Sequence, residues 1–227
     1  MKRFLLCILA AMVPVFISGA QTPYFCDKPG TELRYVREDP GNGKDIWNHM
    51  MTITGGTPSG GSREFDCTSH FTAANGREKE MVDVEYKVLI DREGNVSSDL
   101  SAPVTSAIRH ILPNVDIKAG FSPTILPSVL DPGSVLPDAG TEILIKGKPF
   151  TIKVTERKVL RFEAIETPAG KFDCVVVTEH KTEKFTMYNR DTVSYTWYAR
   201  GVGMVRHDTY RKGKLQTSET LVSITEK

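Results

Sequence analysis

The sequence predicts an all-β, mainly antiparallel protein: a strongly curved meander sheet or half-barrel of about ten to twelve strands, with one short helix and a proline-rich cover. Residues 64–73 and 81–90 alternate between mainly apolar and mainly polar side chains, as antiparallel strands with one wet face do. From residue 141 onward, strand-like runs follow one another through short connectors, which is typical of a meander. Repeated prolines in residues 101–140 leave room for a single short helix.

The N-terminus has the pattern of a secretory signal peptide. Lys2 and Arg3 precede an apolar run over residues 4–17, and small residues follow up to Ala20. The run is too short for a membrane anchor, which needs about 20 apolar residues. We therefore expect cleavage after Ala20 and a single domain over residues 21–227, periplasmic or secreted, with no transmembrane segment in the mature chain.

The charges are balanced, with 29 Lys and Arg against 28 Asp and Glu. Removal of the predicted signal peptide takes away two basic residues and leaves the net charge close to zero. This balance gives no electrostatic reason to expect nucleic acid or an anionic membrane surface as a partner.

Three cysteines follow the predicted signal peptide: Cys26, Cys67 and Cys174. In an oxidising compartment, a pair such as Cys26 and Cys67 could form a disulfide. The alternative is three buried free thiols, because cysteine is among the most buried residue types. Cys7 lies inside the apolar run, so a lipid-anchored N-terminus is not indicated.

In the N-terminal half, residues 31–37 and 45–54 are the first strand candidates. Residues 55–61 contain four glycines and are expected to form a flexible hairpin loop. The run lacks the Lys-Ser/Thr of a phosphate-binding loop. Asn75-Gly76 is a strong hairpin turn signal between the two alternating strands.

Residues 101–140 should cover the sheet. One helix fits between Val104 and Leu112, ended by Pro113. The remainder is irregular yet rich in Leu and Val, which must be buried against something. It forms either a structured crossover or a lid over a pocket.

The C-terminal half should contain a long run of hairpins. Pro168 and Gly170 predict a tight turn, while Gly201 and Gly203 fall inside a strand-like run and indicate a bulge or a close backbone approach. Other connectors are expected at residues 189–191 and at Lys212-Gly213. The predicted strands cover residues 142–146, 150–155, 158–166, 172–180, 182–188, 192–198, 201–210 and 215–225.

The sequence indicates no catalytic residue, metal ligand or cofactor site. The five histidines have no partner at metal-ligand spacing, and no Gly-x-Ser-x-Gly elbow is present. The carboxylate pairs Asp83/Glu85 and Glu163/Glu166 are better explained as solvated strand faces than as a glycosidase pair. Aromatic residues could stack on a sugar or line an apolar cavity, and are otherwise core: Trp47, Tyr86, Tyr195, Trp197 and Tyr198.

Two motifs carry a resemblance to a known family. The runs are TPAGKFDC, residues 167–174, and WYARGVGMV, residues 197–205. They resemble an uncharacterised family of exported bacterial proteins with TPAG-x-F-x-C and WYA-x-GVG motifs, with members in Gram-negative gut-type bacteria. The similarity covers most of residues 120–226. It implies a half-barrel like those of the LolA/LolB lipoprotein carriers, with a helix and loops partly covering the concave face.

Three hypotheses for function follow. The first is an exported, non-catalytic protein that binds a lipid or a lipoprotein acyl chain in a concave sheet, which should then contain a real void. The second is a structural or assembly module of the cell envelope that binds a protein partner, with a self-filled concavity and an exposed apolar patch. The third is an enzyme acting on envelope glycans. We expect a structural role in holding the curved sheet for the signature residues Pro168, Gly170, Trp197, Gly201 and Gly203.

Overall fold

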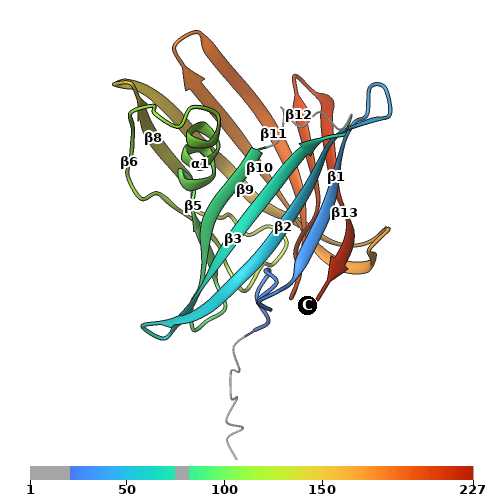
Figure 1. The fold of residues 1–227 in the computed structure, drawn as a ribbon. Coiled ribbons are helices and arrows are strands. Elements are labelled where there is room, and N and C mark those ends of the chain that lie inside the picture. Colours follow the sequence, from blue (N-terminus) through green and yellow to red (C-terminus); the bar gives the residue numbers. More distant parts are fainter. Residues whose placement is uncertain (1–20, 75–81, 227) are drawn as a thin grey trace, which may run out of the picture.

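The computed structural model describes residues 21–74 and 82–226, which form one curved antiparallel sheet of 13 strands and one helix (Figure 1). This confirms the predicted fold class. Its strands are β1 (Glu32–Asp39), β2 (Lys44–Ser59), β3 (Ser62–Ala73), β4 (Val82–Ile90), β5 (Val96–Asp99), β6 (Ile117–Ala119), β7 (Pro123–Leu126), β8 (Ala139–Ile145), β9 (Lys148–Thr167), β10 (Gly170–Phe185), β11 (Tyr188–Ala199), β12 (Gly203–Arg211) and β13 (Lys214–Thr225); the helix is α1 (Ala102–Ile111).

Strand order shows how the two halves of the chain join. It runs β6-β8-β9-β10-β11-β12-β13-β1-β2-β3-β4-β5-β7, so β13 pairs with β1 in the middle of the sheet. The outermost strands, β6 and β7, do not pair with each other. The sheet therefore curves into a half-barrel without closing.

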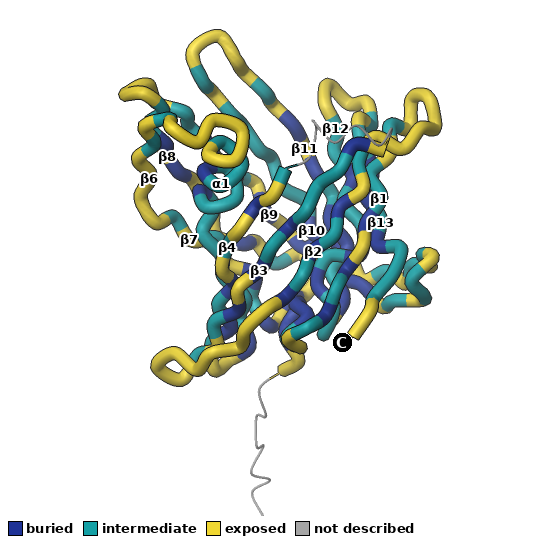
Figure 2. Tube along the Cα trace, in the orientation of Figure 1, coloured by how far each residue is buried: buried dark blue, intermediate teal, exposed yellow. Residues whose placement is uncertain are grey.

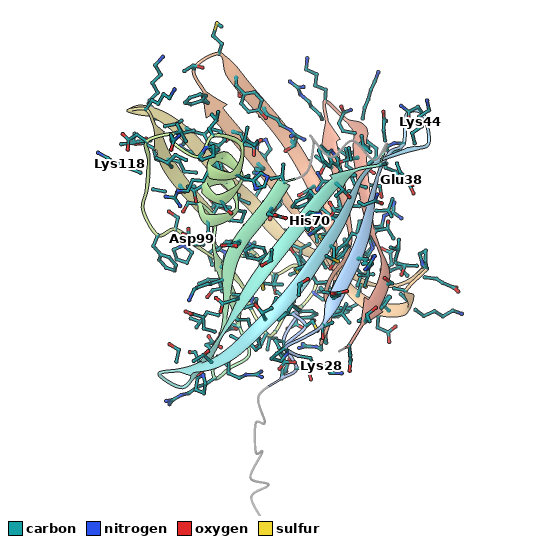
Figure 3. The ribbon with its side chains drawn as sticks, in the orientation of Figure 1. Lys28, Glu38, Lys44, His70, Asp99 and Lys118 are labelled. Atoms are coloured by element: carbon teal, nitrogen blue, oxygen red, sulfur yellow. The ribbon has the colours of Figure 1, made fainter. Side chains whose placement is uncertain are left out.

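The half-barrel has two distinct ends. At one, here called the terminal end, the described chain begins and β13 finishes beside the start of β1 (Figure 1). At the other, here called the hairpin end, lie the turns that join β1 to β2, β10 to β11 and β12 to β13. In Figure 3, Lys28 marks the terminal end, and Glu38 and Lys44 mark the hairpin end.

The hydrophobic core fills the concave face toward the terminal end, where the buried residues gather in Figure 2. Leu33, Ile53, Phe65 and Leu221 are at most 1% exposed. They come from the four neighbouring strands β13, β1, β2 and β3, and Val176 on β10 and Trp197 on β11 belong to the same cluster, so side chains from both halves of the sheet meet across the curve. Burial of each contributes about 1.5–3 kcal/mol of transfer free energy.

Helix α1 spans the gap that the unpaired edges leave. It begins two residues earlier than expected, with Pro103 in its first turn. Proline is tolerated there because backbone N–H groups in the first turn have no acceptor within the helix. Asp99 fixes the approach to the helix (Figure 3) by accepting hydrogen bonds from the backbone nitrogens of Ser101 (3.0 Å) and Ser122 (3.1 Å). Val104 then packs against the cluster around Ile143 on β8.

Beyond the helix, the cover crosses from β7 to the long strand β9. The backbone nitrogen of Gly133 donates to the Val159 oxygen (2.8 Å), and that of Leu136 donates to the Arg157 oxygen (2.8 Å). Leu130 and Leu136 are buried beneath it. Part of the apolar residues in this irregular segment is therefore buried against the sheet.

Two predicted connectors are mostly strand, and of residues 55–61 only Gly60 and Gly61 remain as the turn between β2 and β3. Residues 55–61 were expected to be a loop, but β2 continues to Ser59, with Gly55 (φ +71°) in a register shift between Thr54 and Thr57. Residues 189–191 were expected to be a turn, but they pair with β10 inside β11. The turn lies just before them, where Thr186 has a φ of +47° without being glycine, so no sequence signal marks it.

Two further expectations lie outside the described residues: the signal peptide over residues 1–20 and the Asn75-Gly76 turn.

The signature residues all belong to the terminal half of β9–β12. Pro168 lies in the two-residue turn between β9 and β10, and Gly170 (φ +134°) begins β10. Trp197 is 8% exposed, and its Nε1 donates to Glu163 Oε2 (3.1 Å). Gly201 lies in a turn between β11 and β12, which corrects the expectation that both glycines fall inside one strand.

That turn holds the start of the described chain. The Gly201 nitrogen donates to the Pro23 oxygen (2.8 Å). Arg200 donates from Nη1 to the Thr22 oxygen (2.7 Å), and its guanidinium lies 4.4 Å from the centre of the Tyr24 ring. A Cβ on Gly203 (φ +95°) would lie 3.6 Å from Phe25 Cα, so the expected close backbone approach is present here.

We predict that Gly203→Ala lowers the free energy of unfolding by roughly 1–3 kcal/mol, because an alanine side chain is strained at this positive φ. Gly120→Ala is the matched control, since Gly120 has no positive φ and open space around its Cβ position. Urea denaturation of both variants measures the difference. Equal midpoints for the two would contradict this role for Gly203.

Candidate functional site

An open cavity of about 860 Å³ lies at the hairpin end, between α1 and the concave face of the sheet. This volume is within the usual range for small-molecule sites. Residues from α1, from β1 to β4 and from β8 to β11 surround it: Arg37, His49, Ser69, Phe71, Val84, Tyr86, Pro103, Val104, Ala107, Ile108, Ile111, Ile145, Phe150, Lys181, Glu183, Phe185, Tyr188 and Arg190. We call it the hairpin-end cavity.

One side of the cavity is apolar because of the spacing along α1. Val104, Ala107, Ile108 and Ile111 recur at three- and four-residue intervals and so share one helical face. Ile111 is 63% exposed at the rim. The helix therefore presents an aliphatic surface to the cavity in addition to the side chains it buries.

Aromatic rings from the sheet stand among the other lining residues. Phe150 on β9 and Phe185 on β10 pair edge to face, with 6.0 Å between ring centres. Phe71 on β3 stacks on the His49 ring at 4.3 Å. Tyr86 is the one aromatic residue considered in the sequence as a cavity lining that does line this cavity; Trp47, Tyr195, Trp197 and Tyr198 are absent from its walls.

The deeper part of the concave face is polar. A smaller hollow of about 250 Å³ shares Arg37, Lys181, Glu183 and Arg190 with the hairpin-end cavity. In the pairing of β10 with β11, Glu183 lies opposite Arg190. Directly opposite residues share a face of the sheet, so the alternation along these strands points charged side chains inward here.

A buried ionic network forms the floor beside this hollow. Glu219 on β13 has a side chain only 3% exposed. It accepts hydrogen bonds from His49 Nδ1 (2.6 Å) and from Arg37 Nε (2.8 Å). The other ring nitrogen of His49 lies 2.9 Å from Ser69 Oγ. Strands β13, β1, β2 and β3 are thereby connected by side chains across the concave face.

Opposing effects set the pKa of Glu219. Burial alone would raise it, but the hydrogen bond from His49 and the charges of Arg37 and His49 outweigh burial and hold the pKa at about 2. Nearby, burial lowers the pKa of His207 below its ordinary value, and its Nδ1 lies 2.8 Å from Thr196 Oγ1.

A second, partly buried ion pair connects the floor to the cover. Arg157 Nε lies 3.5 Å from Glu179 Oε2. The same guanidinium donates from Nη1 to the backbone oxygens of Pro137 (2.9 Å) and Ile125 (3.2 Å). A single side chain on β9 therefore ties both sides of the crossover to the concave face.

The remaining candidate groups from the sequence do not converge on the cavity. Asp83 binds His70, and Glu163 binds Arg161 and Trp197. No group of three or more His, Cys, Asp or Glu in the described part of the chain could hold a metal ion. None of the five signature residues lines the hairpin-end cavity.

The three cysteines are buried free thiols, as in the second alternative above. Burial, followed by the charge of Asp66, raises the pKa of Cys67 to about 12, and burial followed by Asp173 raises that of Cys174 to about 12. Such thiols are unreactive at neutral pH.

We predict that Glu219→Gln lowers the free energy of unfolding at pH 7 by about 1.5–3 kcal/mol, because it removes the charge from the acceptor of the His49 and Arg37 hydrogen bonds. Because folding lowers the pKa of Glu219 from its ordinary value of 4.5 to about 2, the ionised carboxylate stabilises the fold at pH values above 4.5. This stabilisation is lost as the pH falls from 4.5 toward 2. The difference from the wild type should therefore shrink on acidification.

Urea denaturation between pH 7 and pH 3.5 measures this effect. Glu226→Gln is the matched control, because its carboxylate pairs with Lys28 in an exposed bridge with both side chains 61% exposed, and such bridges contribute about 0–1 kcal/mol. Equal losses for both variants, or a loss for Glu219→Gln that does not depend on pH, would rule out the proposed role of Glu219.

Two solved structures share this fold. One is a candidate lipoprotein from Parabacteroides distasonis, with 21% identity and a TM-score of 0.71 over 90% of this chain and 99% of that one. The other is a candidate exported protein with a YmcC-like fold from Bacteroides fragilis, with 20% identity and a TM-score of 0.71 over 90% of this chain and 100% of that one. The expected likeness to LolA/LolB carriers is not tested by either structure and stays a prediction.

No curated protein matches the chain. Over the described residues, no helix has the length and hydropathy to cross a bilayer. A family model matches residues 58–221, which is most of the sequence and includes both motifs of the resemblance. The chain belongs to the DUF3108-like family.

Proposed function

We propose that this protein is an exported, non-catalytic binding protein that holds an amphipathic ligand, such as a lipid or a lipoprotein acyl chain, in the hairpin-end cavity. The observation that carries the proposal is the pairing of an aliphatic helix face with a charged floor around one cavity of about 860 Å³. An apolar chain gains about 0.8 kcal/mol for each buried CH₂ group, and a polar head could remain at the charged side.

The proposed function includes no catalytic step. Glu183, the carboxylate that lines the cavity, is paired with Lys181 (2.7 Å). Beside the cavity, Glu179 on the smaller hollow is paired with Arg157, and Glu219 is paired with Arg37. A general acid or base needs a carboxylate that is free to exchange a proton with substrate. These pairs therefore support binding rather than glycan hydrolysis, and we assign no catalytic residue.

The described chain also gives some support to the second hypothesis, an envelope assembly module. Large apolar side chains are exposed along the cover, with Phe121 at 77%, Val129 at 55% and Val135 at 77%. Apolar side chains exposed in this way are a feature of surfaces that bind proteins. A protein partner on the cover is compatible with a ligand in the cavity, because the two involve different surfaces.

We predict that Ala107→Trp weakens binding of dodecanoate at least tenfold, because the indole ring would occupy space that the acyl chain needs. Ala119→Trp is the matched control, since Ala119 is exposed on the edge strand β6 and lines no cavity described above. Native mass spectrometry and titration calorimetry with added dodecanoate measure binding, and thermal unfolding shows that both variants are folded.

A wild-type protein that takes up no dodecanoate, or equal binding by both tryptophan variants, would contradict the proposed function. The search for a partner would then move to proteins that dock on the cover.

A further inference from the structure

Arg190 has an unusual position among the charged residues of the hairpin-end cavity. It lies on β11 and lines both the main cavity and the smaller polar hollow. Its side chain is half-buried. The α1 face of Val104 and Ile108 lines the same cavity, so a guanidinium and an aliphatic surface are available to one ligand.

The other cations that line both hollows already have carboxylate partners. Arg37 Nε donates to Glu219 (2.8 Å), and Lys181 Nζ lies 2.7 Å from Glu183 Oε1. Within residues 21–74 and 82–226, Arg190 has no hydrogen bond or ion pair to its side chain. It is therefore the cation around these hollows whose donors remain available.

The nearest candidate partner by register is Glu183, directly across on β10. That carboxylate is already shared by Lys181 and by the Tyr188 hydroxyl, which donates to it over 3.4 Å. A guanidinium offers five N–H donors in a planar arrangement and binds a carboxylate or phosphate through two parallel hydrogen bonds. An incoming anion would thus satisfy donors that the protein leaves open.

We infer that the ligand of this cavity carries an anionic head group, a carboxylate or phosphate, which Arg190 binds while the attached acyl chain lies along the apolar face of α1. This inference rests on the proposed function and adds the charge of the ligand and the residue that recognises it. Charge complementarity selects the ligand class, since a neutral lipid would leave the Arg190 donors unused.

Calorimetric titrations at pH 8 with three probes test the inference: dodecanoate, 1-dodecanol and acetate. Dodecanoate and the alcohol share a chain length and differ in charge, while acetate has the carboxylate without the chain. We expect wild-type protein to bind dodecanoate at least tenfold more tightly than dodecanol, and acetate only weakly. Arg190→Gln should remove the preference for dodecanoate, and Arg190→Lys should retain part of it.

Arg211→Gln is the matched control, because Arg211 is exposed at the end of β12 and lines neither hollow. Equal affinities of wild-type protein for dodecanoate and dodecanol would overturn the inference and leave the proposed function in place. An unchanged preference in Arg190→Gln would do the same. Tight binding of acetate would show a free-anion site instead of a lipid head-group site. Failure of both long-chain probes to bind would remove the proposed function and this inference together.

Discussion

The fold depends on one constraint: the two edges of its 13-stranded sheet do not meet. A closed barrel has no unpaired edge strand. In an open sheet, the two edges and the concave face between them have to be covered by other parts of the chain. Helix α1 and the crossover to β9 supply that cover, and Arg157 holds the crossover through the Pro137 and Ile125 oxygens. The hairpin-end cavity is the part of the concave face that this cover does not fill.

The concave face changes character along its length. Toward the terminal end it is an apolar core around Phe65 and Leu221, and toward the hairpin end it carries the pair of Arg37 and Glu219. The desolvation of Glu219 is offset only because two donors converge on it. A polar floor of this kind does not collapse to fill space as packed Leu or Val side chains would, so it is compatible with a persistent hollow.

Much of the fold could be predicted from the sequence because period-two alternation is a local signal. The strand over residues 64–73 and the Pro168 turn follow from it and from turn chemistry. The inward direction of Arg190 could not, because Lys181, Glu183 and Arg190 have the pattern of a solvated strand face. Which face is concave is decided by the curvature of the entire sheet, and the β10–β11 turn that sets their register has no glycine or proline. The apolar face of α1 that lines the cavity was partly predictable, because the spacing of Ile108 and Ile111 places them on one side of the helix.

The hydrogen bonds that hold Thr22 and Pro23 against the β11–β12 turn have a consequence for the orientation of the molecule. Since β13 finishes beside the start of β1, both described chain ends lie at the terminal end (Figure 1), whereas the cavity is lined by residues near the hairpin end. A support or fusion partner joined at either end would leave the mouth of the cavity facing solvent. A molecule tethered in this way would present its cavity away from the surface that holds it.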